Sequence, residues 1–331
     1  MAIHTPGRVL VTGGAGYIGS HTTIALLAEG WDVVVADDLS TGQPSLVPGA
    51  ATLHVGNVGD AAFMEPLLAA VRPDAVIHFA GSISVPESVA DPLKYYRNNF
   101  GVSCQLVQMC VNAGIERFIF SSTAAVYGMP EQLPVSEDAP TRPINPYGHS
   151  KLMTEILLRD VAAATTLRYA ALRYFNVAGA DAAGRSGQVV RNSTNLIKVV
   201  AELAAGRRQE ITVFGDDYPT ADGTCIRDFI HVSDLAEAHV AALSYLMNGG
   251  GSQILNCGYG KGFSVKQVLS TADAVVGQKL TYRMGPRRAG DPAAVVAETS
   301  RIRGLLPWTP RHADLALMLR SAINWERGLP G

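Results

Sequence analysis

The sequence predicts an α/β protein with a doubly wound parallel sheet and a smaller, mixed α/β region toward the C-terminus. Short apolar runs alternate with longer segments of helical spacing through the first half of the chain. A glycine-rich turn follows the first apolar run and opens the first helical segment. Of the 331 residues, 47% are hydrophobic and 17% are charged, which favours a large buried core over disorder. Strands that alternate with helices are typical of βαβ units and therefore of parallel sheets.

The first half supplies the predicted strands and helices in order. The run over 32–36 is almost wholly apolar, as expected of a parallel strand that is covered on both faces. Gly30 is a suitable C-terminal stop for the first helix, and Pro92 suits the first turn of the second. The predicted strands are Arg8–Thr12, Asp32–Ala36, Thr52–Val55, Ala75–Phe79, Arg117–Ser121 and Tyr169–Tyr174. The predicted helices are Ile18–Glu29, Pro92–Asn112 and Pro146–Ala163.

The character of the chain changes after Asn176. Residues 179–188 are polar and glycine-rich, and they are interpreted as an excursion or lid loop. Beyond them, strands predicted at Ile211–Phe214, Gln253–Asn256 and Lys279–Arg283 mix with helices predicted at Asn195–Ala205, Val232–Met247 and Val265–Val275. We therefore expect a first domain over 1–178, to which about 225–260 return, and a second region over 179–331.

Composition excludes several classes of protein. A formal net charge of -2 gives no electrostatic case for a nucleic-acid or membrane partner. The four cysteines are too few and too scattered for a disulfide framework, and their spacing predicts no metal site. No apolar run reaches the length of a membrane span, which is about 18 residues. These observations favour a cytoplasmic protein whose cysteines stay reduced.

The glycine-rich turn predicts a dinucleotide site in a Rossmann-like domain. Gly13, Gly16 and Gly19 satisfy G-x-x-G-x-x-G, and Gly14 replaces Gly13 in the alternative G-x-G-x-x-G pattern. Glycines in this context permit a tight turn and let backbone N–H groups approach a pyrophosphate at a helix N-terminus. Asp37 ends the second strand 18 residues after Gly19. A carboxylate there accepts hydrogen bonds from a ribose and repels a 2′-phosphate, which favours NAD over NADP.

Tyr147 and Lys151 lie at i and i+4 near the start of a predicted helix, so they share one helix face. A neighbouring ammonium favours the phenolate form of tyrosine and lowers its pKa from about 10 toward the neutral range. Taken alone, the pair also fits an ordinary amphipathic helix. Thr123 follows a predicted parallel strand, and ligands bind outside the carboxyl ends of such strands. Its hydroxyl is therefore a candidate partner for a substrate oxygen beside Tyr147.

Several further motifs carry a family resemblance. They are His78-Phe79-Ala80-Gly81, Ser122–Gly128 (STAAVYG), Tyr147-x-x-x-Lys151, Arg173–Asn176 (RYFN), Phe214–Thr220 (FGDDYPT), Asp222-Gly223-Thr224 and Arg227–Val232 (RDFIHV). With the glycine turn, these motifs resemble the extended short-chain dehydrogenase/reductase family and, within it, the UDP-glucose 4-epimerase subfamily. The match is collinear from Val9 to about Trp325.

The resemblance implies a role for each matching residue. Tyr147 would be the base, Lys151 would bind the nicotinamide ribose, and Thr123 would contact the sugar 4-oxygen. NAD would be lined by Gly13, Gly16, Tyr17, Ile18, Gly19, Asp37, Asp38, Asn57, Val58, Phe79, Ala80, Gly81, Asn98, Lys151 and Tyr174. The UDP-sugar would contact Thr123, Tyr147, Asn176, Asn195, Leu196, Thr212, Phe214, Arg227, Arg288, Asp291 and Val295. An arginine suits a diphosphate because its guanidinium fork pairs with phosphate oxygens.

The implied reaction is reversible C4 epimerisation of a UDP-hexose through a 4-keto sugar. Val295 stands where members restricted to unmodified hexoses have a bulky tyrosine, so a UDP-N-acetylhexosamine remains an alternative substrate, as does a UDP-pentose. Asn57 replaces an aspartate and Ile83 a lysine that some members have. The segment Gly184–Asn195 departs from the best-known bacterial members.

The same motifs bear on two alternative functions and on a homodimer. A sugar-nucleotide 4,6-dehydratase would carry Asp-Glu after the threonine, where this chain has Ala124 and Ala125. A non-catalytic NAD-sensing protein typically lacks the tyrosine-lysine pair, which is present here. Relatives pair through the helices that correspond to Pro92–Asn112 and Pro146–Ala163, which implies a homodimer.

Overall fold

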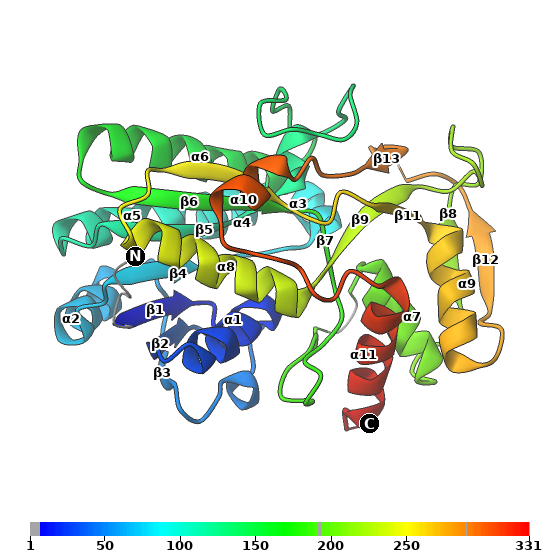
Figure 1. Cartoon of the computed structure of the whole chain (residues 1–331), viewed down its shortest axis with the longest axis horizontal. Coiled ribbons are helices and arrows are strands. Elements are labelled where there is room, and N and C mark those ends of the chain that lie inside the picture. Colours follow the sequence, from blue (N-terminus) through cyan, green and yellow to red (C-terminus); the bar gives the residue numbers. More distant parts are fainter. Residues whose placement is uncertain (1–6, 191–192, 289, 331) are drawn as a thin grey trace.

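The structure, a computed structural model, describes residues 7–190, 193–288 and 290–330. Its centre is a seven-stranded sheet of order β10-β6-β5-β4-β1-β2-β3, in which every neighbouring pair is parallel (Figure 1). The strands are β1 (Arg8–Thr12), β2 (Asp32–Asp37), β3 (Thr52–Val55), β4 (Ala75–His78), β5 (Arg117–Thr123), β6 (Arg168–Tyr174) and β10 (Gln253–Cys257). The predicted doubly wound α/β fold is confirmed.

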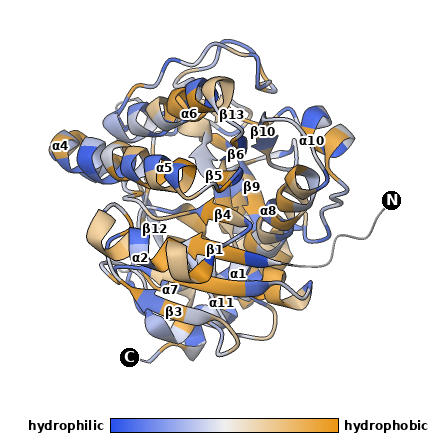
Figure 2. Ribbon diagram, turned by 90° about the vertical axis from the view of Figure 1, so that its left-hand side faces the viewer, coloured by the Kyte–Doolittle hydropathy of each residue, from blue (hydrophilic) through white to orange (hydrophobic). Residues whose placement is uncertain are grey.

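Helices cover both faces of this sheet. On one side lie α1 (Tyr17–Ala28) and α8 (Val232–Met247), and on the other lie α2 (Ala61–Val71), α5 (Val102–Asn112) and α6 (Pro146–Ala164) (Figure 1). Val9 and Val11 of β1 join the first core cluster and Leu10 joins the second, because successive side chains of a strand point to opposite faces. Strands β1 and β4 are correspondingly hydrophobic in Figure 2.

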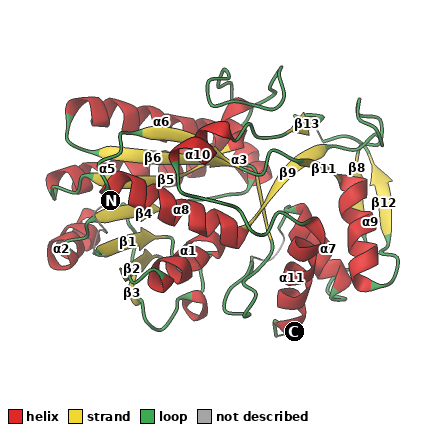
Figure 3. Ribbon diagram, viewed as in Figure 1, coloured by secondary structure: helices red, strands yellow, loops and turns green. Residues whose placement is uncertain are grey.

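The C-terminal region is mixed α/β, as predicted (Figure 3). Strand β9 (Ile226–His231) pairs with β7 (Asn176–Ala178), β11 (Gly262–Ser264) and β13 (Ala294–Val295), while β8 (Ile211–Phe214) pairs with β12 (Tyr282–Gly285). The helices of this region are α7 (Leu196–Ala204), α9 (Val265–Val276), α10 (Ser300–Leu305) and α11 (Leu315–Gly328). Strand β10 returns to the large sheet beside β6.

Several elements differ from the prediction. The helix expected over 92–112 consists of α4 (Pro92–Tyr95), a π-helical stretch (Tyr96–Gly101) and α5. The strand expected at 279–283 begins three residues later, as β12, which is largely exposed and pairs with β8. Helices α2, α3 (Val85–Ala90), α10 and α11 and strands β7, β9, β11 and β13 were not predicted. In α11 the buried side chains nevertheless recur at i, i+3, i+4, i+7 and i+8, which is the spacing of an amphipathic helix.

Over the part of the chain that the structure describes, no helix is both long and apolar enough to cross a membrane.

Candidate active site

The carboxyl ends of β1, β4, β5 and β6 open onto one cavity of about 720 Å³. Strand β1 lies between β4 and β2, so the chain winds outward in opposite directions from this point of the sheet. Ligands of open α/β sheets bind at such switch points. The cavity is lined by the glycine-rich turn, the end of β2, the residues that follow β4, and the first turn of α6.

The glycine-rich turn depends on missing side chains. Gly13 has a φ of +69°, and a Cβ there would lie 2.6 Å from the backbone nitrogen of Ala80. A Cβ on Gly19 would lie 2.2 Å from the carbonyl oxygen of Gly13. Gly14 has a different role from that predicted, because it packs beneath Val35 rather than lining the cavity. The turn therefore follows the pattern that begins at Gly13.

The N-terminus of α1 is suited to an anion. Its N-cap, Gly16, makes no side-chain capping bond, and its first turn holds no acidic residue. The N–H groups of this turn thus have no competing carboxylate, and the helix dipole favours negative charge there. Asp37 accepts hydrogen bonds from the backbone nitrogens of Ala15 and Leu39, each at 2.9 Å, and burial raises its pKa. A pyrophosphate beside Gly16 and a ribose beside Asp37 fit this arrangement.

We expect Gly13→Ala to weaken NAD binding and to lower the melting temperature. A left-handed backbone costs a residue with a Cβ about 1–2 kcal/mol, and here the added carbon also meets the backbone of Ala80. Gly49→Ala is the matched control, because a Cβ at Gly49 has nothing within 4 Å. Calorimetric titration with NAD and thermal unfolding check both effects. Equal NAD affinity in the two variants would contradict this role for Gly13.

Tyr147 and Lys151 both face the cavity from α6, and Thr123 reaches it from the end of β5. Asn145 caps the N-terminus of α6, since its side-chain oxygen accepts a hydrogen bond from the Gly148 nitrogen at 2.8 Å. Lys151 is buried, and its ammonium donates to the carbonyl oxygen of Ser121 at 3.0 Å. Burial lowers the pKa of Lys151 to about 8. The sequence prediction that these three residues meet at one site is consistent with this geometry.

The pKa of Tyr147 is shifted upward rather than downward in the protein itself. Desolvation raises it, and the neighbouring Thr123 side chain acts in the opposite direction. The ring of Tyr95 packs edge-on against Tyr147 with centroids 6.4 Å apart. The Tyr95 hydroxyl is fixed in turn, because it donates to Glu87 at 2.8 Å.

A buried ion pair between β6 and α6 was not predicted from the sequence. Arg173 on β6 donates to both carboxylate oxygens of Glu155 on α6, and both side chains are at most 4% exposed. Ser122 also donates to Glu155, and Arg173 donates to the Tyr127 hydroxyl at 3.0 Å. The available signal was spacing, because Glu155 lies at i+8 from Tyr147 and at i+4 from Lys151.

The structure divides the remaining predicted residues between two places. The predicted residues that line the cavity are Gly13, Gly16, Tyr17, Ile18, Gly19, Asp37, Asp38, Asn57, Val58, Phe79, Ala80, Gly81, Asn98, Thr123, Tyr147, Lys151, Tyr174, Asn176 and Asn195. The predicted residues outside this lining are Leu196, Thr212, Phe214, Arg227, Arg288, Asp291 and Val295. The cavity therefore gathers all the residues predicted for the cofactor, and the outer group lies on the C-terminal region.

The outer residues form pairs of their own. Arg227 lies 3.5 Å from the carboxylate of Asp291 and donates to the carbonyl oxygen of Pro292 at 2.9 Å. The guanidinium of Arg288 lies 3.9 Å from the ring centroid of Phe214. These arginines come from segments more than 60 residues apart, and both belong to the region around β8 and β9. Both are guanidinium groups, which pair with phosphate oxygens, and Arg227 is already paired with Asp291.

Sequence reasoning missed part of the lining. Residues 82–84 and Glu87 follow β4, and they face the cavity together with Gln188, Val189 and Val190. The rule that ligands lie beyond the carboxyl ends of parallel strands predicts the first group. The second group arrives through tertiary contacts of the excursion, for which the sequence holds no local signal. Residues 191–192 of the segment Gly184–Asn195 lie outside the described residues.

The fold, the glycine-rich turn and the tyrosine-lysine pair define a dinucleotide-binding protein of the short-chain dehydrogenase/reductase type. The model of the NAD dependent epimerase/dehydratase family matches residues 9–258, and the chain belongs to this family. It is 56% identical over 322 residues to the UDP-glucose 4-epimerase of Azospirillum brasilense, covering 97% of this chain and 92% of that one.

Solved structures give the same relationship. The UDP-glucose 4-epimerase from Brucella ovis in complex with NAD matches with a TM-score of 0.94 and 44% identity, covering 97% and 98% of the two chains. The UDP-Glc/GlcNAc 4-epimerase from Campylobacter jejuni matches with a TM-score of 0.86 and 46% identity, covering 98% of this chain and 100% of that chain. The family resemblance predicted from the sequence motifs is therefore confirmed.

Proposed function

We propose that the chain is an NAD-dependent epimerase that reversibly inverts C4 of a UDP-hexose and so interconverts UDP-glucose and UDP-galactose. The observation that carries the proposal is the meeting of Tyr147, Lys151 and Thr123 in the same cavity as the glycine-rich turn. The names of the relatives support the substrate class, and the NAD complex of the Brucella ovis enzyme supports the cofactor.

Each residue of the cavity has a proposed task. Tyr147 takes the proton of the sugar 4-hydroxyl and later returns it to the 4-oxygen, while Thr123 holds this oxygen by a hydrogen bond. Lys151 supplies positive charge beside the phenol and binds the nicotinamide ribose. When bound, NAD would supply the chemistry of hydride exchange at C4, and return of the hydride to the opposite face of the 4-keto sugar would invert that centre. The C4 inversion therefore needs no net oxidant.

We expect the diphosphate of the substrate to be bound tightly and the hexose to be bound weakly. Arg227 and Arg288 are the proposed phosphate ligands, since a guanidinium pairs with two phosphate oxygens at once. Both lie outside the lining of the cavity that holds Tyr147. A sugar anchored only through its diphosphate is free to present either face of C4 to the same cofactor, which inversion requires.

The proposal is tested by incubating the purified chain with UDP-galactose and NAD and following the products by NMR and by absorbance of NADH. We expect UDP-glucose to form until equilibrium, with no accumulation of NADH beyond the enzyme concentration. Accumulation of NADH with release of an oxidised sugar would show a dehydrogenase instead. UDP-glucose dehydration to a 4-keto-6-deoxy sugar would show the dehydratase, which would have to work with Ala124 and Ala125 beside Thr123.

A UDP-N-acetylhexosamine is the second candidate substrate. Val295 is 9% exposed and packs with Ala124, Val126 and Tyr127, next to the strand end that carries Thr123. The Campylobacter jejuni relative is named for both UDP-Glc and GlcNAc. If Val295 widens the sugar site, kcat/KM for UDP-N-acetylglucosamine stays above about one thousandth of that for UDP-glucose, a ratio that corresponds to ~4 kcal/mol. Val295→Tyr would then lower only the N-acetylated activity.

We further propose that residues 1–178, with the returning segment about 225–260, form the NAD-binding domain and that 179–331 mainly bind the UDP-sugar. The return of β10 to the large sheet supports this division. A cytoplasmic location is supported by four cysteines that all remain free thiols. Crystal structures with NAD and with UDP bound test this division, because they show which residues contact each ligand.

A homodimer through α4–α5 and α6 is also proposed. Leu93, Met153 and Ile156 are 61%, 36% and 40% exposed and support it. Leu106, Val107 and Met109 of α5 lie in the core of the chain itself and lend the dimer no support. Light scattering of the purified chain tests the dimer, and Ile156→Glu is expected to shift the mass toward that of one chain.

A further inference from the structure

One wall of the cavity is held from two sides by buried side chains. Its segment 186–188 lies between α1 and α11. The Ser186 hydroxyl bonds with the Ser20 hydroxyl at 2.6 Å and lies 3.3 Å from the His21 ring nitrogen Nδ1. Gly187 lies against the indole of Trp325, where a Cβ would come within 2.4 Å of the ring. The segment thus has little room to move relative to either helix.

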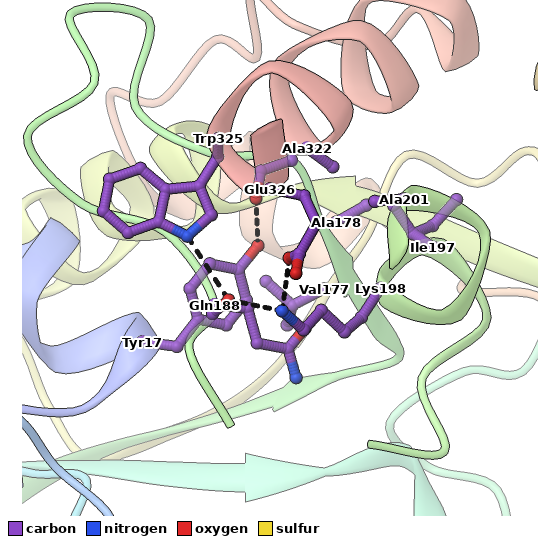
Figure 4. A pocket seen from close by; sticks show the side chains of 11 residues that line it. Tyr17, Val177, Ala178, Gln188, Ile197, Lys198, Ala201, Ala322, Trp325 and Glu326 are labelled. Atoms are coloured by element: carbon purple, nitrogen blue, oxygen red, sulfur yellow. Dashed lines mark hydrogen bonds and ion pairs between the residues drawn. The ribbon is translucent and has the colours of Figure 1, made fainter. Parts of the chain in front are cut away.

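The carbonyl oxygen of Gln188 is the point where α7 and α11 hold this wall. It accepts hydrogen bonds from the ammonium of Lys198 at 3.0 Å and from the indole nitrogen of Trp325 at 3.3 Å (Figure 4). The Lys198 ammonium also pairs with Glu326, and the two side chains are 5% and 4% exposed. A buried ammonium is costly without a counter-charge, so Glu326 stabilises Lys198 where it reaches Gln188.

The segment 186–188 continues into the lining of the cavity. Gln188, Val189 and Val190 line it, as do residues 193–195. The side chain of Gln188 donates to the Ser193 hydroxyl at 3.2 Å and so joins the two parts of the wall. Asn195 caps α7 three residues before Lys198, and its side chain donates to the Val177 carbonyl oxygen at 2.9 Å. One helix therefore carries both a predicted UDP-sugar ligand and the lysine that fixes the wall.

We infer that Lys198 is a positioning residue for nucleotide-sugar binding, which acts through the Gln188 carbonyl to fix the wall that includes Asn195. This inference rests on the proposed function, because it assigns the wall to the UDP-sugar. Lys198 neither faces the main cavity nor reaches the catalytic tyrosine. Its loss is therefore expected to change ligand affinity and to leave the chemical step intact.

The test compares Lys198→Met/Glu326→Leu with the unaltered chain. Removing both charges avoids a lone buried carboxylate, and apolar replacements of buried ion pairs are often tolerated. We expect the dissociation constant of UDP, titrated into the NAD-loaded enzyme, and KM for UDP-glucose to rise at least about tenfold, which corresponds to ~1.4 kcal/mol. The kcat at saturating substrate is expected to stay nearly constant. Trp325→Phe keeps an aromatic ring but removes the indole N–H that donates to Gln188. It is also expected to weaken UDP binding.

The matched control is Arg311→Met/Glu237→Leu, which removes an exposed ion pair on the surface of the chain and should leave UDP affinity unchanged. A folded Lys198→Met/Glu326→Leu variant with unaltered UDP affinity overturns the inference while leaving the proposed function in place. A fall in kcat with constant KM also overturns it. If the double variant does not fold, Trp325→Phe decides: unaltered UDP affinity there overturns the inference. Failure of the unaltered chain to bind UDP contradicts the proposed function itself.

Discussion

Replacing Tyr147 by phenylalanine is expected to lower kcat for the C4 inversion by about 10²–10⁴-fold, the range that a positioned acid-base group contributes. The change removes only the hydroxyl that takes the proton of the sugar 4-OH. The ring that packs edge-on with Tyr95 remains, so the fold and the cavity are expected to persist. NMR detection of UDP-glucose formed from UDP-galactose measures the loss over the necessary range.

The control for this variant is Tyr282→Phe, which removes a phenol hydroxyl from the exposed strand β12. We expect its turnover to equal that of the unaltered chain. Binding of UDP and NAD to the Tyr147→Phe variant should be nearly unchanged, because the hydroxyl acts in the transition state. Turnover that survives in Tyr147→Phe would refute the assignment of the base.

The pH dependence of kcat/KM reports on the same phenol. Desolvation raises the pKa of Tyr147, so at neutral pH the unliganded protein holds it mostly as the neutral phenol. We therefore expect kcat/KM to rise as the pH increases from 6 toward 8. Burial lowers the pKa of Lys151 to about 8, and above that pH the loss of its positive charge is expected to flatten the rise. The residual activity of Tyr147→Phe should lack the rise.

Local sequence patterns predict most of the sheet and the cofactor side of the cavity. The run that forms β2 carries Asp37 at its end, and the glycines around Gly16 mark the turn before α1. Both depend on residues close together in the sequence. The π-helical stretch over 96–101 was not predicted, because hydrophobic periodicity does not distinguish it from an α-helix.

Long-range pairing explains what the sequence could not supply. Gln188, which lines the cavity, accepts hydrogen bonds at its carbonyl oxygen from Lys198 and Trp325, and Trp325 lies 137 residues away in the chain. Charge composition gave no hint of Glu155 and Arg173 as buried groups, since charged residues are normally exposed. The i+4 spacing places Glu155 on the same face of α6 as Lys151, but its pairing with Arg173 follows from the packing of α6 on β6.

Replacing Arg173 by methionine is expected to lower the free energy of unfolding by about 3–5 kcal/mol, because it leaves the Glu155 carboxylate buried without its partner. Arg173 makes two hydrogen bonds to Glu155 and others to Tyr127 and to the Glu137 carbonyl oxygen, so several buried groups lose a donor together. Urea-induced unfolding, followed by circular dichroism, measures the change.

The double variant Arg173→Met/Glu155→Leu separates the ion pair from the packing around it. Removing both charges is expected to restore much of the lost stability, since apolar pairs of similar volume often replace buried ion pairs. Arg283→Met, which breaks an exposed pair with Glu210, should cost about 1 kcal/mol or less. If Arg173→Met also lowers the free energy of unfolding by only about 1 kcal/mol, the buried pair contributes no more to stability than a surface pair.

Activity in the double variant then tests whether the pair also positions the catalytic helix. Glu155 lies on α6 with Tyr147 and Lys151, and Ser122, which donates to Glu155, directly precedes Thr123. The pair therefore connects the helix that carries the base to the strand end that carries its hydroxyl partner. If this connection sets their separation, the restored double variant folds but keeps a lowered kcat with little change in KM. Full recovery of kcat would confine the role of Glu155 and Arg173 to stability.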